Sequence, residues 1–309
     1  MPRLCVPLVP SRRRLRPLAI GLGALLCIGL TTSQVGRAQE ASSSPSSSPR
    51  SSEDISTVRP VSIVTWGDLK GVAIGTGLAA LAVPFDGRVR NATQREQWQR
   101  VDAWQDLATA GNSWGDPTVL ALSTTMWIGG RFTGHPQVAQ VGLRAFETIG
   151  VSGVITRVLK VAIGRARPNI SPNEVWNTGR GRGSSSLRGT GAYESLPSGH
   201  ATAAFAFASA VSSEVARIAP DHVRTVRLTT YGLATWTAYS RMHTDAHWLS
   251  DVVLGAAVGT VTGWAVTRWH ATRPGNVIDR TLLGETVVTP LVTPAPLGGT
   301  HVGVSLRWP

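Results

Sequence analysis

Thiol groups are nearly absent from this chain of 309 residues, which holds only two cysteines, Cys5 and Cys27. Both cysteines lie within residues 1–38, so the remainder can form no disulfide and offers no thiolate to a metal or a substrate. Zinc fingers and thiol catalysis are therefore excluded for residues 39–309. The chain also has no stripe of cations interleaved with aromatic residues, and we therefore expect no nucleic-acid partner.

Long uncharged stretches are lacking as well. The longest uncharged helical run that we delimit in residues 61–273, Val252–Thr267, has 16 residues, about 24 Å of helix against roughly 30 Å of bilayer hydrocarbon. The mean hydropathy of +0.04 points the same way. Against this, Trp248, Trp264 and Trp269 flank or end the last apolar segment, as interfacial tryptophans do. We slightly favour a bundle that is soluble or lies on a membrane, and an integral membrane protein stays open.

Residues 1–38 have the pattern of an export signal. Four arginines between positions 12 and 16 form a basic start, and Pro17–Leu30 is an apolar run of the usual length. A small-residue cleavage site then follows at Gly36-Arg37-Ala38. The alternative is an uncleaved anchor, although the apolar run is short for a span. We expect export to the periplasm or cell envelope.

The rest of the chain divides into three parts. Residues 39–60 contain a Ser/Pro tract that cannot bury a core and should be a disordered linker. Residues 61–273 fit one domain. Residues 274–309 are rich in Val and Thr on either side of a Pro/Gly turn, which predicts a short β-hairpin or an extended tail. Without residues 1–38 the chain has 24 basic and 18 acidic residues, a surface suited to phosphorylated substrates or anionic lipid headgroups.

Six apolar segments in the domain have the length and periodicity of helices. They are Leu69–Phe85, Pro117–Gly130, Val141–Ile163, His200–Ile218, Leu228–Tyr239 and Leu249–Trp269. The sequence therefore predicts an all-α fold, a helical bundle of about six core helices.

The first of three chemical motifs pairs Lys160 with Arg167-Pro168. The two cations are seven residues apart, so a helix would place them on one face, and Pro168 should end that helix with Arg167 at its tip. An arginine fork and a lysine point charge suit a phosphate group, although such a pair is usually solvated. Arg165, which lies between them, is expected to be solvated.

The second motif, Pro197-Ser198-Gly199-His200, should open a helix. Unpaired amides at a helix start, a hydroxyl from Ser198 and the bare backbone of Gly199 make a site for an anion. His200 would stand beside that anion, whereas the alternative is a histidine that only caps the helix.

The third motif contains Ser240-Arg241, His247 and Asp251. His247 and Asp251 are four residues apart, so on a helix the carboxylate could accept the proton of one imidazole nitrogen and leave the other as a lone pair. That orientation suits a nucleophile or a base. Arg241 can bring a further cation, while an ordinary surface His/Asp pair is the competing interpretation. His243 and Asp245 could contact a substrate at the rim.

Together the three motifs resemble the signature of the type 2 phosphatidic acid phosphatase superfamily, which also includes vanadium haloperoxidases. The resemblance covers about Leu69–Trp269. It implies that His247 forms a phosphohistidine, that Asp251 holds it, and that His200 serves the leaving group and then water. It also implies phosphate binding by residues of all three motifs: Lys160, Arg167, Ser198, Gly199 and Arg241.

The expected function is a metal-independent phosphatase acting on a lipid phosphate, an isoprenoid diphosphate or a small soluble ester. No cofactor and no metal site are expected, because the chain shows no obvious carboxylate or cysteine cage. One alternative is a vanadate-dependent haloperoxidase, against which the short chain argues. The other is a non-catalytic protein that binds anionic lipid, against which both histidines and Asp251 argue. The polar loop Asn169–Glu194, with Arg180, Arg182 and Arg188, is either a lid or a plain surface loop.

Overall fold

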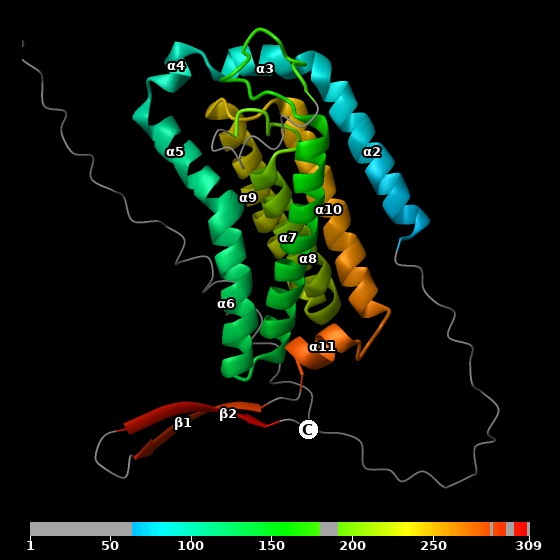
Figure 1. Cartoon of the computed structure of the whole chain (residues 1–309), viewed down its shortest axis with the longest axis vertical. Coiled ribbons are helices and arrows are strands. Elements are labelled where there is room, and N and C mark those ends of the chain that lie inside the picture. The colour runs from blue at the N-terminus through cyan, green and yellow to red at the C-terminus, as the bar shows by residue number, and fades with distance from the viewer. Residues whose placement is uncertain (1–63, 180–190, 285–286, 295–299, 308–309) are drawn as a thin grey trace, which may run out of the picture.

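A computed structural model describes residues 64–179, 191–284, 287–294 and 300–307. The expected signal peptide and linker, and the three arginines of the expected lid, lie outside these residues. Six long helices form the bundle, labelled as in Figure 1: α2 (Trp66–Ala82), α6 (Val119–Phe132), α7 (Pro136–Ile163), α8 (Gly199–Ile218), α9 (Val223–His243) and α10 (Leu249–Ala271). The predicted all-α bundle and its six apolar helices are confirmed.

Shorter elements lie at the two ends of the bundle. Between α2 and α6 the chain forms α3 (Asp86–Thr93), α4 (Glu96–Gln99), α5 (Asp102–Ser113) and a π-helical turn, Trp114–Thr118. At the opposite end lie α11 (Val277–Leu282) and an antiparallel hairpin of β1 (Val287–Pro294) and β2 (Thr300–Arg307), as Figure 1 shows. Of the two forms expected for the C-terminal tail, a β-hairpin or an extended segment, the structure therefore has the β-hairpin.

Helix α8 is the centre of the bundle. Its alanines between 201 and 210, together with Phe207, Val211 and Val215, are buried, and they pack against α7, α9 and α10. Because these side chains are small, the neighbouring helices can approach α8 closely. The core of the domain therefore surrounds one alanine-rich helix.

The contact between α8 and α10 depends on three glycines of α10 at a spacing of four, Gly255, Gly259 and Gly263. A Cβ atom on Gly259 would lie 2.3 Å from the carbonyl oxygen of Thr202 and 2.7 Å from the amide nitrogen of Ala206. Small residues at this spacing allow two helix backbones to touch. The start of α10 is thereby held against the start of α8.

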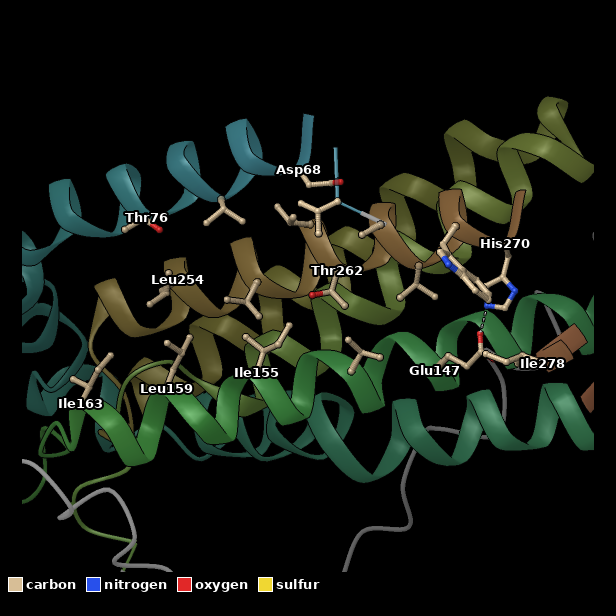
Figure 2. Close-up of a pocket in the computed structure, with 18 residues that line it drawn as sticks. Asp68, Thr76, Glu147, Ile155, Leu159, Ile163, Leu254, Thr262, His270 and Ile278 are labelled. Carbon is tan, nitrogen blue, oxygen red and sulfur yellow. Dashed lines mark ion pairs between the residues drawn. The ribbon is translucent and has the colours of Figure 1, made fainter. Parts of the chain in front are cut away.

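An apolar groove runs along the bundle between α2, α7 and α10 (Figure 2). Its volume is about 850 Å³. Rows of side chains four residues apart line it, such as Ile155 and Leu159 on α7 and Leu254 and Val258 on α10. One end is polar, where His270 Nε2 lies 2.8 Å from a carboxylate oxygen of Glu147. The other end reaches Ile163, the last residue of α7.

Among the described residues, two helical stretches are long and apolar enough to cross a membrane, Trp66–Thr93 and Leu249–Ala271. Only 22 % of the apolar window in the first stretch is buried. Large apolar side chains of α2 and α7 also face outward, including Trp66 at 77 % exposure and Val154 at 66 %. The expectation of a bundle that is soluble or lies on a membrane rested on the length of the uncharged runs. The complete helices are longer than these runs because they also contain a few charged residues, and they therefore reach the length needed to cross a membrane.

Candidate active site

The three motifs meet at one end of the bundle. Helices α7 and α9 end there, and α8 and α10 begin there, so helix ends from three separate parts of the sequence converge (Figure 1). This end carries all eight predicted site residues: Lys160, Arg167, Ser198, Gly199, His200, Arg241, His247 and Asp251.

The first motif leaves its helix earlier than its sequence suggested. Gly164 adopts a left-handed conformation with φ of 60° and ends α7 at Ile163, so Arg167 lies beyond the helix. The expectation that Pro168 ends the helix, with both cations on one helical face, is therefore wrong. Lys160 is buried and donates from Nζ to the carbonyl oxygen of Glu194.

Arg167 is held by the loop that follows. Its Nε donates to the carbonyl oxygen of Gly191 at 2.9 Å, and its amide donates to that of Ala192 at 3.0 Å. The two cations of this motif therefore lie near each other because the chain leaves the helix at Gly164, and not because they share a helical face.

The second motif begins α8 as predicted. Ser198 is the N-cap in an extended conformation, and its hydroxyl accepts from the amide of Ala201 at 3.5 Å. A Cβ atom on Gly199 would have one neighbour within 4 Å, the Thr156 side chain at 4.0 Å, so a ligand can approach the backbone there. Gly199 and Lys160 both line a cavity of about 260 Å³ between α7 and α8. The helix start thus faces a space beside a cation.

The third motif differs from its expected geometry. His247 precedes α10, and its Nδ1 lies 2.7 Å from the carbonyl oxygen of Ser195 but 3.7 Å from a carboxylate oxygen of Asp251. The backbone carbonyl oxygen of Ser195 therefore accepts the hydrogen bond from the imidazole N–H that the sequence assigned to Asp251. With Nδ1 donating, Nε2 keeps its lone pair, as a nucleophile requires.

Asp251 holds the segments on either side of His247. One carboxylate oxygen accepts from the Ser195 hydroxyl and from the amide of Trp248, the latter at 2.9 Å. Its backbone carbonyl accepts from the amide of Ser198 at 2.9 Å. Asp251 therefore positions His247 indirectly, through its hydrogen bonds with Ser195 and Trp248.

Arg165 contradicts its expected role as a solvated side chain. It is 0 % exposed and donates from Nη1 to Asp251 at 2.6 Å and from Nη2 to Asp86 at 2.8 Å. Asp86 lies at the start of α3 and was not singled out in the sequence, because nothing near it marks a functional residue.

Helix α5 and the π-helical turn also reach the site. Asn112 Oδ1 accepts from Arg241 Nη1 at 3.1 Å, and the Arg241 carbonyl oxygen accepts from the His247 amide at 3.2 Å. A Cβ atom on Gly115 would lie 2.8 Å from that of His200. Because π-helical turns are frequent at functional sites, the turn is a signal that only a structure reveals.

The charges of the site act on both histidines. Burial lowers the pKa of His200 to about 4, and the cations of Arg241, Arg167 and Lys160 add to the effect. Burial first, and then the same three cations, hold the pKa of His247 well below its ordinary value. Both imidazoles are therefore neutral near pH 7 when no anion is bound.

The lysine is perturbed as well. Burial, followed by repulsion from Arg167, lowers the pKa of Lys160 to about 7. Burial also lowers the pKa of Arg167. Three cations so close together with little solvent create a positive potential that favours an anion.

Two residues expected at the rim are engaged elsewhere. His243 is buried and stacks on Tyr239, and Asp245 forms two contacts of 2.8 Å with Arg90 of α3. Among the described residues, no group of three or more His, Cys, Asp or Glu side chains is arranged to hold a metal ion.

The part of the chain that holds the three motifs is similar in sequence to known proteins. Residues 142–274 match the model of the PAP2 superfamily, and this range includes all three motifs. A lipid A 1-phosphatase of Rhizobium etli is 34 % identical over 127 residues, which is 41 % of this chain and 48 % of that protein. A lipid A 1-phosphatase of Rhizobium johnstonii is 34 % identical over 122 residues, 40 % of this chain and 45 % of that protein. The chain thus spans about half the length of these curated relatives.

A solved structure shares the fold. The transmembrane PAP2 type phosphatidylglycerolphosphate phosphatase of Bacillus subtilis superposes with a TM-score of 0.51 at 18 % identity, over 69 % of this chain and all of that one. The likeness at this identity concerns the arrangement of helices. The match to the PAP2 superfamily thus covers residues 142–274, which hold all three motifs, and the solved structure shares the arrangement of helices.

Proposed function

We propose that the chain is a metal-independent phosphatase that hydrolyses a phosphorylated lipid through a phosphohistidine on His247. The observation that supports this most is the convergence of three cations on two neutral histidines beside the start of α8. Phosphoryl transfer needs in-line positioning and neutralised negative charge, and this set of groups supplies both.

The reaction would proceed in two displacements. His247 Nε2 attacks phosphorus and the bond to the leaving oxygen breaks, while His200 gives its proton to that oxygen. Water then attacks phosphorus as His200 takes a proton from it, and the P–N bond breaks to release phosphate. Lys160, Arg167, Arg241, the Ser198 hydroxyl and the Gly199 amide would hold the phosphoryl oxygens.

The substrate itself would prepare His200 for this role. In the anion-free site His200 is neutral, since its pKa is about 4. A phosphate dianion placed among the three cations offsets their charge and favours the imidazolium. The acid would thus form when the substrate binds.

Two observations support a lipid as the substrate. The relatives found in Rhizobium are named lipid A 1-phosphatases, and residues 142–274 of this chain match the PAP2 superfamily model. The apolar groove starts beside the site, since Leu159 and Ile163 flank Lys160 on α7. An acyl chain in this groove would cover side chains that otherwise face solvent, at a gain of roughly 25 cal/mol per Å².

We further propose that the enzyme is membrane-associated and exported by residues 1–38, with residues 61–273 as the phosphatase domain. The two apolar helical stretches and the outward-facing side chains of α2 and α7 support membrane association.

The test is phosphate release from a long-chain lipid phosphomonoester and from a small soluble ester, both in excess chelator. The wild type should release phosphate, and His247→Ala should not. His135→Ala, which replaces an exposed histidine outside the site, serves as the control. Radiolabelled phosphate should remain on the wild-type protein after an alkaline quench and be absent from His247→Ala. Full activity of His247→Ala would exclude the phosphohistidine, and loss of activity in chelator would exclude metal independence.

Groove occupancy has its own test. Val258→Trp narrows the middle of the groove without touching the site. It should lower kcat/KM for the long-chain substrate and leave that for the soluble ester unchanged. Equal effects on both esters would argue against acyl-chain binding in the groove.

A further inference from the structure

Behind the site lies a fully buried ionic cluster of Asp86, Arg165 and Asp251, all 0 % exposed. Arg165 bridges the two carboxylates, with contacts of 2.8 Å to Asp86 and 2.6 Å to Asp251. Ser250 joins the cluster, because its amide and hydroxyl donate to Asp86 at 2.8 and 2.6 Å. The cluster thus links α3, the end of the first motif and the start of α10.

The guanidinium of Arg165 is fixed from every side. Its Nε and Nη2 donate to the carbonyl oxygen of Val175 at 3.1 and 2.7 Å, and Nη1 donates to the Ser250 hydroxyl at 2.7 Å. The rings of Trp176 and Trp248 lie 4.7 and 5.4 Å from its central carbon. A side chain with this many partners has one available position.

Stability alone does not explain such a buried ionic cluster. The desolvation of buried charges offsets much of the free energy gained from their attraction, and well-packed apolar residues can often replace a buried ion pair without loss of stability. A role in geometry explains the arrangement better.

The chain of contacts from Arg165 leads to His247. Arg165 fixes one oxygen of Asp251, and the other oxygen accepts from the Ser195 hydroxyl. The carbonyl oxygen of Ser195 in turn accepts the Nδ1 proton of His247 at 2.7 Å. No member of this chain before His247 is among the groups proposed to touch phosphate.

We propose that Arg165, held by Asp86, is a positioning residue that fixes the Asp251 carboxylate and, through Ser195, the direction of the His247 lone pair. This inference rests on the proposed function. Without the guanidinium, Asp251 loses the partner of one oxygen, and its carboxylate can rotate away from Ser195. His247 would then leave the line of attack, whereas the three phosphate-binding cations would stay in place.

The test compares Arg165→Met and Asp86→Asn with the wild type. Asp86→Asn keeps the volume and one carbonyl oxygen, so it serves as the milder variant if Arg165→Met folds poorly. We expect kcat to fall about 100-fold, as for a misplacement of about 1 Å, with KM and the affinity for inorganic phosphate changed less than threefold. The ¹⁵N resonances of His247 should show a mixed tautomer in the variants and a single one in the wild type.

A control variant separates charge removal as such from positioning. Arg217→Met removes a half-exposed arginine whose ion pair with Glu214 lies in the last turn of α8, at the opposite end of the bundle from the site. Its kcat should fall far less than that of Arg165→Met.

The outcomes separate this inference from the proposed function. If Arg165→Met and Asp86→Asn keep wild-type kcat while His247→Ala is inactive, the inference is wrong and the function stands. If kcat and phosphate affinity fall together, the cluster is merely structural and the inference is likewise overturned. If the wild type releases no phosphate, the proposed function fails, and the ¹⁵N signals and phosphate binding still decide whether Arg165 orients His247.

Discussion

The contact between α8 and α10 makes a quantitative prediction for Gly259→Ala. The new Cβ would lie 2.3 Å from the Thr202 carbonyl oxygen, a backbone atom that cannot rotate away. The helices would have to separate by about 0.7 Å to bring this contact to an acceptable 3.0 Å, and such overpacking costs roughly 1–3 kcal/mol.

Gly232→Ala on α9 is the matched control. It has no neighbour within 4 Å of a new Cβ, so it should gain the helix propensity of alanine, about 0.8–1 kcal/mol. Gly259→Ala has the same gain, and the difference between the two variants therefore measures the overpacking. For a domain of this size we expect Gly259→Ala to melt roughly 2–12 °C below Gly232→Ala.

The same displacement of the helices should also change the catalytic site. The amide of Ser198, in the second motif, donates a hydrogen bond to the carbonyl oxygen of Asp251 at 2.9 Å, and Gly259 lies two turns beyond Asp251 on α10. A shift of about 0.7 Å there should lower kcat between 10- and 100-fold. The assays are thermal unfolding in detergent and phosphate release from a lipid phosphomonoester. Equal melting temperatures and equal kcat for the two variants would refute the close-packing argument.

Three further predictions follow from the site and from α2. The charge of Lys160 is present below its pKa of about 7 and lost above it, so KM should rise with pH above 7 in the wild type, and this rise should disappear in Lys160→Arg. Asn112→Ala removes one hydrogen-bond acceptor of Arg241 and should lower kcat/KM roughly 10- to 100-fold, since hydrogen bonds to charged groups contribute about 1.5–3 kcal/mol. Asp68→Asn weakens both the partly exposed ion pair with Arg268 and the capping box at the start of α2. The free energy of unfolding, measured by denaturant titration, should therefore fall by about 1 kcal/mol.

Much of the bundle could be predicted because its helices are long apolar runs. Helices α3, α4 and α5 were not predicted, since residues 86–113 contain no long apolar run. Their helical form depends on contacts with distant segments, such as the pair between Arg90 and Asp245. Local sequence carries no record of such contacts.

The motif residues could be assigned from order and spacing, but their contacts could not. Arg165 was expected in solvent because its buried partner Asp86 lies 79 residues away in the chain. His247 and Asp251 were placed on one helical face, whereas α10 begins at Leu249 and a backbone carbonyl orients the imidazole. Sequence spacing identifies the candidate site residues, but the path of the loops determines which of their side chains are in contact.

The contacts of α3 and α5 bear on how this chain could be cut into fragments or joined to parts of its relatives. The superfamily match begins at residue 142, yet Asp86, Asn112 and Gly115 reach the site from before that point. A gene fragment for residues 142–274 would encode every motif but leave Arg165 and Arg241 without these partners. A chimera that exchanges phosphatase domains between relatives should therefore be joined ahead of α2, so that the motifs and their supporting helices are inherited as one unit.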